Sequence, residues 1–462
     1  MDIRKDEQTL QYVAEIRQKN KIDKENGKQN TAFVLTFGCQ QNEADSEQLR
    51  GFLIEMGYKI DTTPENADVV LINTCAVREH AELKALSTIG EYKHKKSLNP
   101  NMLLGVCGCM TAQQHRVDEL KNRYPYVDFT LEPSAIHRLP EVMLRRLEGK
   151  RRTFVLGEDT HEVTEGIVAD RTITHRAWVS IMNGCNNFCS YCIVPYVRGR
   201  ERSRNSEDII AEVKSLVDRG CHDITLLGQN VNSYKSDCDF ATLVEKICRI
   251  EGDFLVRFMT SHPKDVPDKL IEVMSREEKV APHFHLPIQS GSDRILSVMN
   301  RHYNMEHYIS IVEKLRAKMP DISITSDIIV GFPGESDEDF EQTIAMLEKV
   351  RFDMVYSFIY SKRKGTPAAD MPDQIPEKIK SERFDILLKI QEQISLECNK
   401  SYEGKVYRVL VDGMSRTQGV YSARTASNKL VHFESTGDLI GKYVNVEIYR
   451  ADAFAMYGAI VK

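Results

Sequence analysis

The sequence lacks the features that would place it in a membrane or on a secretory route. No apolar run approaches the ~20 residues that a membrane-spanning helix needs, and Met1 to Asp6 do not open an apolar signal segment. Strong positive charge is also missing, because 62 Lys and Arg stand against 68 Asp and Glu for a formal net charge of −6. Any RNA contact must therefore come from local patches. We expect a soluble, cytoplasmic protein without membrane contact.

Cysteine, by contrast, is plentiful. The 462-residue chain carries 11 cysteines, and without a secretory signal they argue against a disulfide framework. Metal or redox chemistry in a reducing cytosol explains them better. The length is too great for one typical domain, and we expect about three.

Three of these cysteines lie in one short loop with C-x3-C-x2-C spacing, at Cys185, Cys189 and Cys192. Three soft thiolates suit three irons of a 4Fe–4S cluster and leave the fourth iron open to a small cofactor. A structural zinc site would normally want a fourth protein ligand. Three unconnected buried cysteines are the plain alternative. The loop resembles the signature of the radical S-adenosylmethionine (SAM) enzymes, including the aromatic Tyr191 before the last cysteine.

Three apolar runs near the N-terminus each end in a cysteine, over 33–39, 69–75 and 102–109. Their spacing fits one strand–helix unit each, which predicts a parallel sheet buried on both faces. The carboxyl ends of such strands meet at one edge, so Cys39, Cys75 and Cys109 would stand together. Each of them alone could be a core cysteine, and Cys107 could face the same side as Cys109.

A second strand–helix series follows, with strands expected at 178–184, 223–228, 255–260, 283–288, 322–330 and 354–360. Six units suit an open, partial barrel, and chemistry in barrels sits at the carboxyl ends of strands. Polar or glycine residues occupy those ends and are typical of a SAM pocket. Together with Tyr191, the candidate SAM contacts are Gln229, Asn230, Ser261, Gln289, Ser290 and Gly331.

The remaining candidates concern RNA. Four arginines follow the cysteine loop, Arg198, Arg200, Arg202 and Arg204, and could neutralise RNA phosphates or form an ion-paired surface loop. A charged helix over 377–399 leads to short β runs between 402 and 462, which predict a small β-barrel. That barrel is a candidate RNA-binding appendage or simply a structural cap.

Taken together, the motifs resemble the radical SAM methylthiotransferases, and most closely their MiaB type. The resemblance covers about residues 31–462. It rests on the cysteine loop and on Gly38-Cys39-Gln40-Gln41-Asn42, Asn73-Thr74-Cys75-Ala76-Val77-Arg78, Gly108-Cys109-Met110, Val194-Pro195-Tyr196, Leu227-Gly228-Gln229-Asn230-Val231, Thr260-Ser261-His262-Pro263 and His285-Leu286-Pro287-Ile288-Gln289-Ser290-Gly291-Ser292.

The resemblance implies an α/β fold in three parts: an N-terminal parallel-sheet Rossmann-like domain, a central partial (βα)6 radical SAM barrel, and a C-terminal small β-barrel of the TRAM type. The expected boundaries are 31–150, 171–400 and 401–462, after a partly helical, partly flexible charged extension over 1–30. In the TRAM segment, Arg424, Asn428 and Lys429 match the family's recognisable stretch and are implied RNA contacts.

The resemblance also implies the cofactors. An auxiliary 4Fe–4S cluster would be held by Cys39, Cys75 and Cys109, which leaves Cys107 a bystander. A second 4Fe–4S cluster would be held by Cys185, Cys189 and Cys192, and SAM would serve as methyl donor and radical source.

The implied reaction is methylthiolation at C2 of N6-isopentenyladenosine beside the anticodon of tRNA. Related branches modify N6-threonylcarbamoyladenosine in tRNA or a ribosomal-protein aspartate. A non-catalytic RNA-binding iron–sulfur protein, or an electron carrier, is the more distant alternative. The implied partners are the anticodon stem-loop, an electron donor and sulfur or cluster supply proteins, and we expect a monomer.

Overall fold

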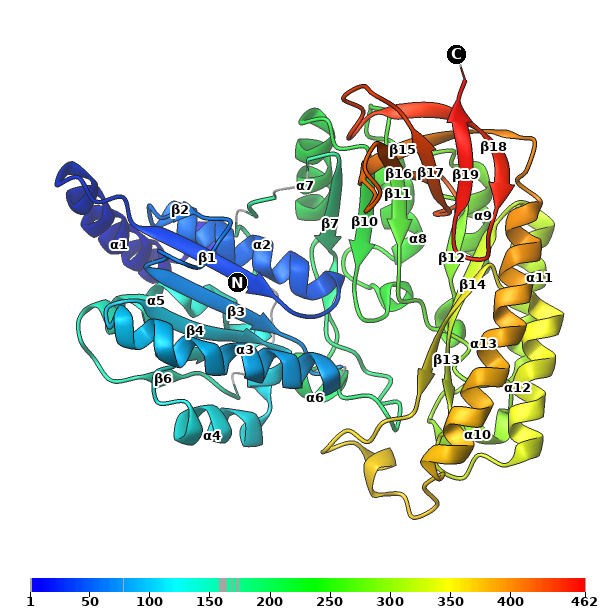
Figure 1. Ribbon diagram of the computed structural model, residues 1–462, viewed down its shortest axis with the longest axis horizontal. Coiled ribbons are helices and arrows are strands. Elements are labelled where there is room, and N and C mark those ends of the chain that lie inside the picture. The colour runs from blue at the N-terminus through cyan, green and yellow to red at the C-terminus, as the bar shows by residue number, and fades with distance from the viewer. Residues whose placement is uncertain (1, 78, 158–163, 168, 172–173, 462) are drawn as a thin grey trace. The chain divides into compact units, whose positions relative to one another are not determined.

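The computed structural model describes residues 2–461 except 78, 158–163, 168 and 172–173 (Figure 1). The chain divides into two compact units. The first unit comprises Met1–Thr172, Met182–Asn186 and Cys192–Arg204, and the second comprises Ile173–Ile181, Asn187–Tyr191 and Asn205–Lys462. The loop that carries three of the cysteines is therefore shared between the two units.

The first unit is built on a parallel sheet, as predicted. Its strand order is β2-β1-β3-β4-β5-β6, with β1 (Thr31–Thr36), β2 (Lys59–Ile60), β3 (Val69–Thr74), β4 (Leu103–Gly108), β5 (Phe129–Leu131) and β6 (Thr153–Phe154). Strands β3 and β4 are buried at every position because helices cover both faces. From β1 the chain adds β2 on one side and β3 to β6 on the other, so the topological switch point lies between β1 and β3. Ligands of such sheets bind at the switch point.

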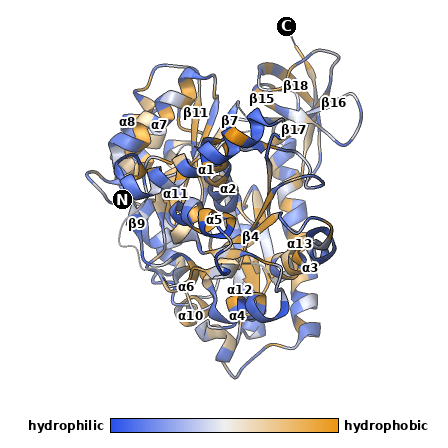
Figure 2. Ribbon diagram, turned by 90° about the vertical axis from the view of Figure 1, so that its left-hand side faces the viewer, coloured by the Kyte–Doolittle hydropathy of each residue, from blue (hydrophilic) through white to orange (hydrophobic). Residues whose placement is uncertain are grey.

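Helices surround this sheet on two sides (Figure 1): α1 (Glu7–Glu25), α2 (Gln40–Glu55), α3 (Glu79–Leu98), α4 (Gln114–Arg123) and α5 (Leu139–Leu147). One core contains Leu49 of α2 and Val142 of α5, and the other contains Ile89 of α3 and Leu120 of α4. Hydrophobic residues predominate along β4, whereas the helices carry both hydrophilic and hydrophobic residues (Figure 2).

The N-terminal segment contains a long helix. We expected residues 1–30 to be partly helical and partly flexible, and α1 is continuous over 19 residues, with Val13 and Ile16 buried in the core beside α2 and α5. At its C-terminal end, Asn20 donates a hydrogen bond to the Met56 carbonyl over 2.8 Å. This burial makes α1 an integral layer of the first unit.

The second unit contains all six predicted strands, arranged as two parallel sheets with the orders β7-β10-β11 and β12-β13-β14. The strands are β7 (Arg176–Ser180), β10 (Asp223–Leu227), β11 (Leu255–Phe258), β12 (His283–His285), β13 (Ser323–Val330) and β14 (Met354–Ile359). The intervening helices are α7 (Ser206–Asp218), α8 (Phe240–Cys248), α9 (Asp268–Arg276), α10 (Asp293–Val298), α11 (Met305–Lys318) and α12 (Asp337–Val350). This alternation is the predicted open barrel.

The C-terminal part of the second unit is the predicted small β-barrel. Helix α13 (Glu377–Lys400) precedes a closed barrel of order β15-β16-β17-β19-β18, formed by β15 (Val406–Met414), β16 (Val420–Thr425), β17 (Leu430–Glu434), β18 (Tyr443–Ala451) and β19 (Met456–Ile460). Short elements β8 (Met182–Asn183), α6 (Val194–Arg198) and β9 (Arg202–Ser203) flank the cysteine loop. No helix within the described ranges is long and apolar enough to cross a bilayer.

Candidate cluster and cofactor sites

Cys39, Cys75 and Cys109 lie at the carboxyl-terminal edge of the first unit's sheet. Cys39 is the N-cap of α2, Cys75 follows β3 directly, and Cys109 follows β4. The loops are close, since a Cβ added to Gly38 would come within 3.0 Å of the Cys75 Cβ. Cys109 packs with Ala76, the residue after Cys75. The topology therefore brings three distant cysteines to one place.

The environment of these thiols suits a metal centre. Cys75 and Cys109 are each only 2% exposed, whereas Cys39 reaches solvent. Burial raises the pKa of the Cys109 thiol to about 12, and the guanidinium of Arg198 opposes this increase. A thiol of this kind loses its proton when iron binds, because the metal ligand is the thiolate. The donor set therefore fits an iron–sulfur cluster.

Cys107 differs from Cys109 in its surroundings. It belongs to the main core of the first unit, with Phe129 and Leu131 of β5, and is 1% exposed. Burial raises the pKa of its thiol to about 12. An apolar core position gives Cys107 a packing role, which agrees with treating it as a bystander.

A buried amide network holds the loops that carry Cys39 and Cys75. Asn42 Nδ2 donates to the Thr74 carbonyl over 3.1 Å, and Asn42 Oδ1 accepts the Cys39 backbone N–H over 3.4 Å. Asn73 Nδ2 donates to the Asn42 carbonyl over 2.8 Å and to Ser46 Oγ over 2.9 Å. The sequence motifs include Asn42 and Asn73 but predict no role for either residue. The signal for the role of Asn73 is that it is a polar residue in the otherwise apolar run of β3, whereas Asn42 lies in the first turn of α2.

The arginines after the cysteine loop are mostly engaged within the protein. Arg198 is buried and forms an ion pair with Asp45 of α2 at 2.6 Å, which favours the ion-paired alternative for this residue over an RNA contact. Arg204 pairs with Glu165 at 2.8 Å, and Arg202 donates to the Arg198 carbonyl over 3.1 Å. Arg200 is exposed and stays a candidate. The ion-paired alternative therefore describes this stretch better.

The loop with Cys185, Cys189 and Cys192 is anchored at both ends. The Cys185 N–H donates to the Gly199 carbonyl over 3.1 Å within the first unit. In the second unit, Asn300 Nδ2 donates to the carbonyls of Asn187 and Phe188 over 3.1 and 3.0 Å. Among the residues described, no three His, Cys, Asp or Glu side chains form a closed metal site. Both cluster assignments therefore remain predictions from sequence spacing and topology.

The strand ends of the second unit hold several buried polar atoms without partners: Gln229 Oε1, both amide atoms of Asn232, Ser261 Oγ and His262 Nε2. Buried polar groups are nearly always satisfied, so such a group of atoms indicates a ligand or water. His262 Nδ1 accepts the Lys264 N–H over 3.3 Å, which leaves its proton on Nε2. Burial, and then the nearby Arg301, keeps the pKa of His262 far below its usual value. A neutral N–H donor and amide oxygens suit the ribose and amino acid groups of SAM.

Other predicted SAM contacts are occupied by the protein itself. Asn230 Nδ2 donates to Asp265 over 2.7 Å, and its Oδ1 accepts the His262 N–H over 3.1 Å. Ser290 Oγ accepts the Ser292 N–H over 3.2 Å. A Cβ on Gly331, at φ +71°, would lie 2.3 Å from Lys380 Cγ, so close packing explains this glycine. These residues shape the strand ends, and direct SAM contact by them remains a prediction.

Two further candidates, Gln289 and Tyr191, sit close to these ends. Gln289 adopts φ +66°, its N–H donates to the Asp327 carbonyl over 2.8 Å, and its carbonyl accepts the Ile329 N–H over 2.9 Å. It thereby joins the end of the β12 segment to β13. Tyr191 packs edge-on against Phe332 with ring centroids 6.4 Å apart. Both stay candidates.

The predicted RNA contacts of the C-terminal barrel also have partners within the protein. Lys429 is 8% exposed, forms an ion pair with Asp353 at 2.5 Å and donates to Asn399 Oδ1 over 2.8 Å. It therefore joins the barrel to α13 and to the residue before β14, and these contacts favour a structural role over an RNA contact. Arg424 is partly exposed, pairs with Asp412 at 3.2 Å and donates to the Asn428 carbonyl over 3.1 Å. Arg424 and Asn428 remain candidates.

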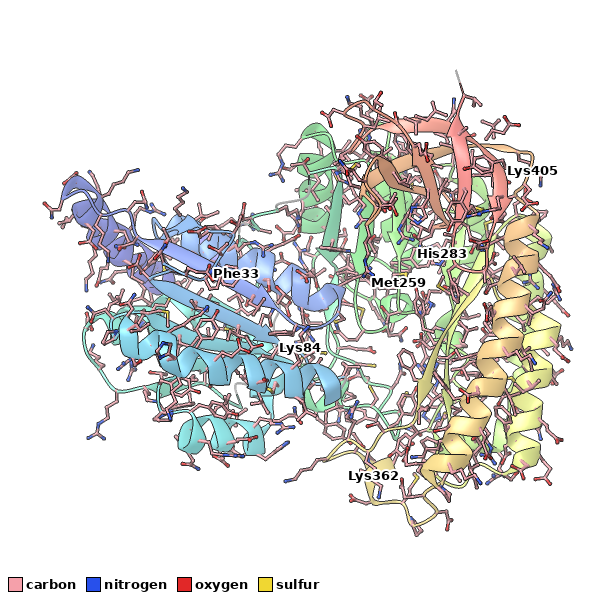
Figure 3. All side chains as sticks on the ribbon, viewed as in Figure 1. Phe33, Lys84, Met259, His283, Lys362 and Lys405 are labelled. Atoms are coloured by element: carbon pink, nitrogen blue, oxygen red, sulfur yellow. The ribbon has the colours of Figure 1, made fainter. Side chains whose placement is uncertain are left out.

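The C-terminal barrel also contacts polar residues of the central strands. Arg257 of β11 pairs with Asp223 at 2.7 Å and donates to the carbonyls of Thr425 and Ala426 over 3.1 and 2.6 Å. On the next strand, β12, His283 (labelled in Figure 3) is buried, and its Nε2 lies 3.0 Å from Thr325 Oγ1. The barrel is thus fixed to the central strands by buried polar contacts.

Comparison with known proteins agrees with this architecture. Residues 179–347 match the radical SAM superfamily, residues 31–132 match a family described as uncharacterized protein family UPF0004, and residues 400–461 match the TRAM domain. Among solved structures, the fold is similar to the radical SAM methyltransferase TsrM from Kitasatospora setae, with a TM-score of 0.56, 13% identity, and 74% of this chain and 75% of that chain covered.

Similarity to curated proteins is far higher. The chain is 48% identical to a tRNA-2-methylthio-N(6)-dimethylallyladenosine synthase from Thermoanaerobacter sp. (strain X514), over 98% of both chains. It is 45% identical to the protein of the same name from Clostridioides difficile (strain 630), over 99% of this chain and 98% of the relative. The chain therefore belongs to the tRNA-2-methylthio-N(6)-dimethylallyladenosine synthase family, and its central part belongs to the radical SAM superfamily.

Proposed function

We propose that this protein methylthiolates C2 of N6-isopentenyladenosine beside the anticodon of tRNA, with SAM as methyl donor and radical source. The observation that carries the proposal is identity of 45–48% to synthases of this name over nearly the whole chain. The TRAM match over residues 400–461 supports tRNA as the substrate. A single-stranded anticodon loop presents bases that need not be pulled out of a duplex.

The proposal assigns each cysteine triad a cluster. Cys39, Cys75 and Cys109 would hold the auxiliary 4Fe–4S cluster, and Cys185, Cys189 and Cys192 the radical SAM cluster. When bound, these groups and SAM supply the sulfur, its methyl group and the radical that activates an inert C–H bond.

The protein's own residues orient these groups. The amides of Asn42 and Asn73 fix the loops that carry Cys39 and Cys75. At the strand ends of the second unit, Ser261 Oγ and His262 Nε2 offer buried polar atoms that the protein leaves without partners. Buried polar groups that are already in position bind a ligand without reorganising when the reaction occurs.

The setting follows from the reaction. We infer a cytoplasmic enzyme that meets tRNA after the isopentenyl group has been added. It would draw electrons from a low-potential donor protein and sulfur from cluster supply proteins. We infer that it acts as a monomer.

Nucleoside mass spectrometry on tRNA from cells that lack the gene tests the substrate. We expect the 2-methylthio form to disappear and N6-isopentenyladenosine to accumulate, and a plasmid copy to reverse both changes. If 2-methylthio-N6-threonylcarbamoyladenosine disappeared instead, the substrate would be wrong. No change in either nucleoside would remove tRNA as the target.

Cysteine variants test the division of labour between the triads. Wild-type protein should bind roughly eight iron atoms per chain, as two 4Fe–4S clusters require. Cys75→Ala should keep SAM cleavage and lose thiolation, whereas Cys189→Ala should lose both. The matched control is Cys221→Ala, because Cys221 is equally buried but has no ligand spacing. Thiolation by the Cys75→Ala protein would refute the auxiliary assignment.

A further inference from the structure

Arg301 is a buried cation without a carboxylate partner. It lies just beyond α10 and is 5% exposed. Its guanidinium donates to the Pro287 carbonyl over 2.9 Å, to Tyr303 Oη over 3.4 Å and to Cys189 Sγ over 3.6 Å. Within the described part of the chain, no Asp or Glu forms an ion pair with it.

The other buried arginines differ in this respect. Arg198 pairs with Asp45, Arg257 with Asp223 and Arg383 with Glu335, at 2.6–2.7 Å. A charge that is removed from water without a counter-charge is strongly unfavourable, so buried charges are normally paired. The sulfur of Cys189 is the acceptor of Arg301 that would be an anion once it bound a metal, because the metal ligand is the thiolate. Tyr303 is buried, and its pKa is raised.

The guanidinium is held rigidly against this sulfur. Its plane packs on the Tyr303 ring, 5.2 Å from the centroid, and Tyr303 Oη donates to the Ile288 carbonyl over 2.7 Å. The same segment clamps the cysteine loop, because the Ser190 N–H donates to the Met299 carbonyl over 3.0 Å. These contacts hold the guanidinium and the cysteine loop against each other.

We propose that Arg301 is a positioning residue that pairs with the Cys189 thiolate and eases one-electron reduction of the cluster held by Cys185, Cys189 and Cys192. This inference rests on the cluster assignment in the proposed function. Reduction adds one electron, taken from a low-potential one-electron reductant, and makes the cluster more negative. A fixed cation beside a ligand sulfur stabilises the reduced state more than the oxidised state. Arg301 keeps its proton, so no proton moves.

The test is a redox titration followed by electron paramagnetic resonance, with dithionite as reductant. A background of Cys39→Ala, Cys75→Ala and Cys109→Ala leaves only the radical SAM cluster to be observed. In Arg301→Gln, we expect the ratio of reduced to oxidised cluster at a given potential to fall about tenfold, which is about 59 mV for a one-electron couple. Arg301→Lys keeps the charge and should stay near the wild-type potential. The matched control is Arg316→Gln, because Arg316 donates to the Val350 carbonyl and to no cysteine.

Several outcomes would overturn the proposal. An unshifted potential in Arg301→Gln at full iron content would do so, and so would an equal shift in Arg301→Lys, since charge would then not be the cause. If Arg301→Gln retains no iron, the proposal stands only if Arg301→Lys still holds a cluster at the wild-type potential. Weaker SAM binding with an unchanged potential would assign Arg301 to the cofactor instead. Wild-type protein that holds both clusters but never thiolates tRNA would refute the proposed function, yet leave the potential shift testable.

Discussion

Replacing Lys429 by Met separates a structural role from an RNA contact. Lys429 Nζ pairs with Asp353 at 2.5 Å, and the two side chains are 9% and 13% exposed. Met keeps most of the apolar stem but removes the charge. Asp353 Oδ2 would retain the Ile324 N–H at 2.8 Å, while Oδ1 would lose its cation. The substitution therefore leaves a nearly buried carboxylate half satisfied.

The size of the effect follows from this geometry. Removing one partner of a buried ion pair costs about 3–5 kcal/mol, and the remaining hydrogen bond and slight exposure of Asp353 place this case near the lower end. Asp353→Asn in the same protein removes the stranded charge and should recover most of the loss. Asp353 and Lys429 should thus be strongly non-additive in a double-mutant cycle.

Urea unfolding followed by Trp178 fluorescence measures this loss. Trp178 is the chain's single tryptophan and lies on β7, opposite Thr225 of β10, in the same unit as Lys429. With a slope of about 3 kcal/mol per M, a loss of about 3 kcal/mol lowers the midpoint by about 1 M. Two results together would refute the reasoning: an unchanged midpoint, and a slope of log binding constant for tRNA against log salt concentration that is smaller by about one. They would indicate that Lys429 contacts a phosphate.

Three further predictions concern packing, pH and thiol access. Gly105→Ala on β4 should destabilise the first unit by about 1–3 kcal/mol in urea unfolding, because its Cβ would lie 2.4 Å from Phe129; unchanged stability would contradict this. Burial holds the pKa of His283 well below its usual value, so the unfolded chain takes up a proton below about pH 6.5 that the folded protein does not. The contribution of His283 to the free energy of unfolding should therefore be constant above that pH and decrease below it. In His283→Gln, the slope of the free energy of unfolding against pH in this acidic range should be smaller by at most about 1.4 kcal/mol per pH unit. Iodoacetamide should label exposed Cys39 of the iron-free protein much faster than buried Cys109, as read by peptide mass spectrometry; equal rates would contradict the geometry.

Local patterning made most of the fold predictable. Apolar runs such as 69–75 predicted strands buried on both faces, and β3 is buried at all six positions. Regular spacing of strands and helices predicted β1, β3 and β4 of the six-stranded parallel sheet and the six strands of the open barrel. Residues 1–30 were harder, because α1 buries only a narrow apolar stripe, and a charged helix of this kind resembles a flexible tail in sequence.

For the candidate site residues too, the sequence predicts some features and only the tertiary structure determines the others. Cysteine spacing alone singled out Cys185, Cys189 and Cys192, because ligands from one loop must lie close in sequence. Tertiary structure decided the rest. It brought Cys109 beside Ala76, placed Cys107 in the core, and paired Arg198 and Lys429 with buried carboxylates. A sequence records that a side chain is charged, but the carboxylate that pairs with it lies 153 positions away for Arg198. Only folding brings such partners together, and so only folding determines which cations remain free for a ligand.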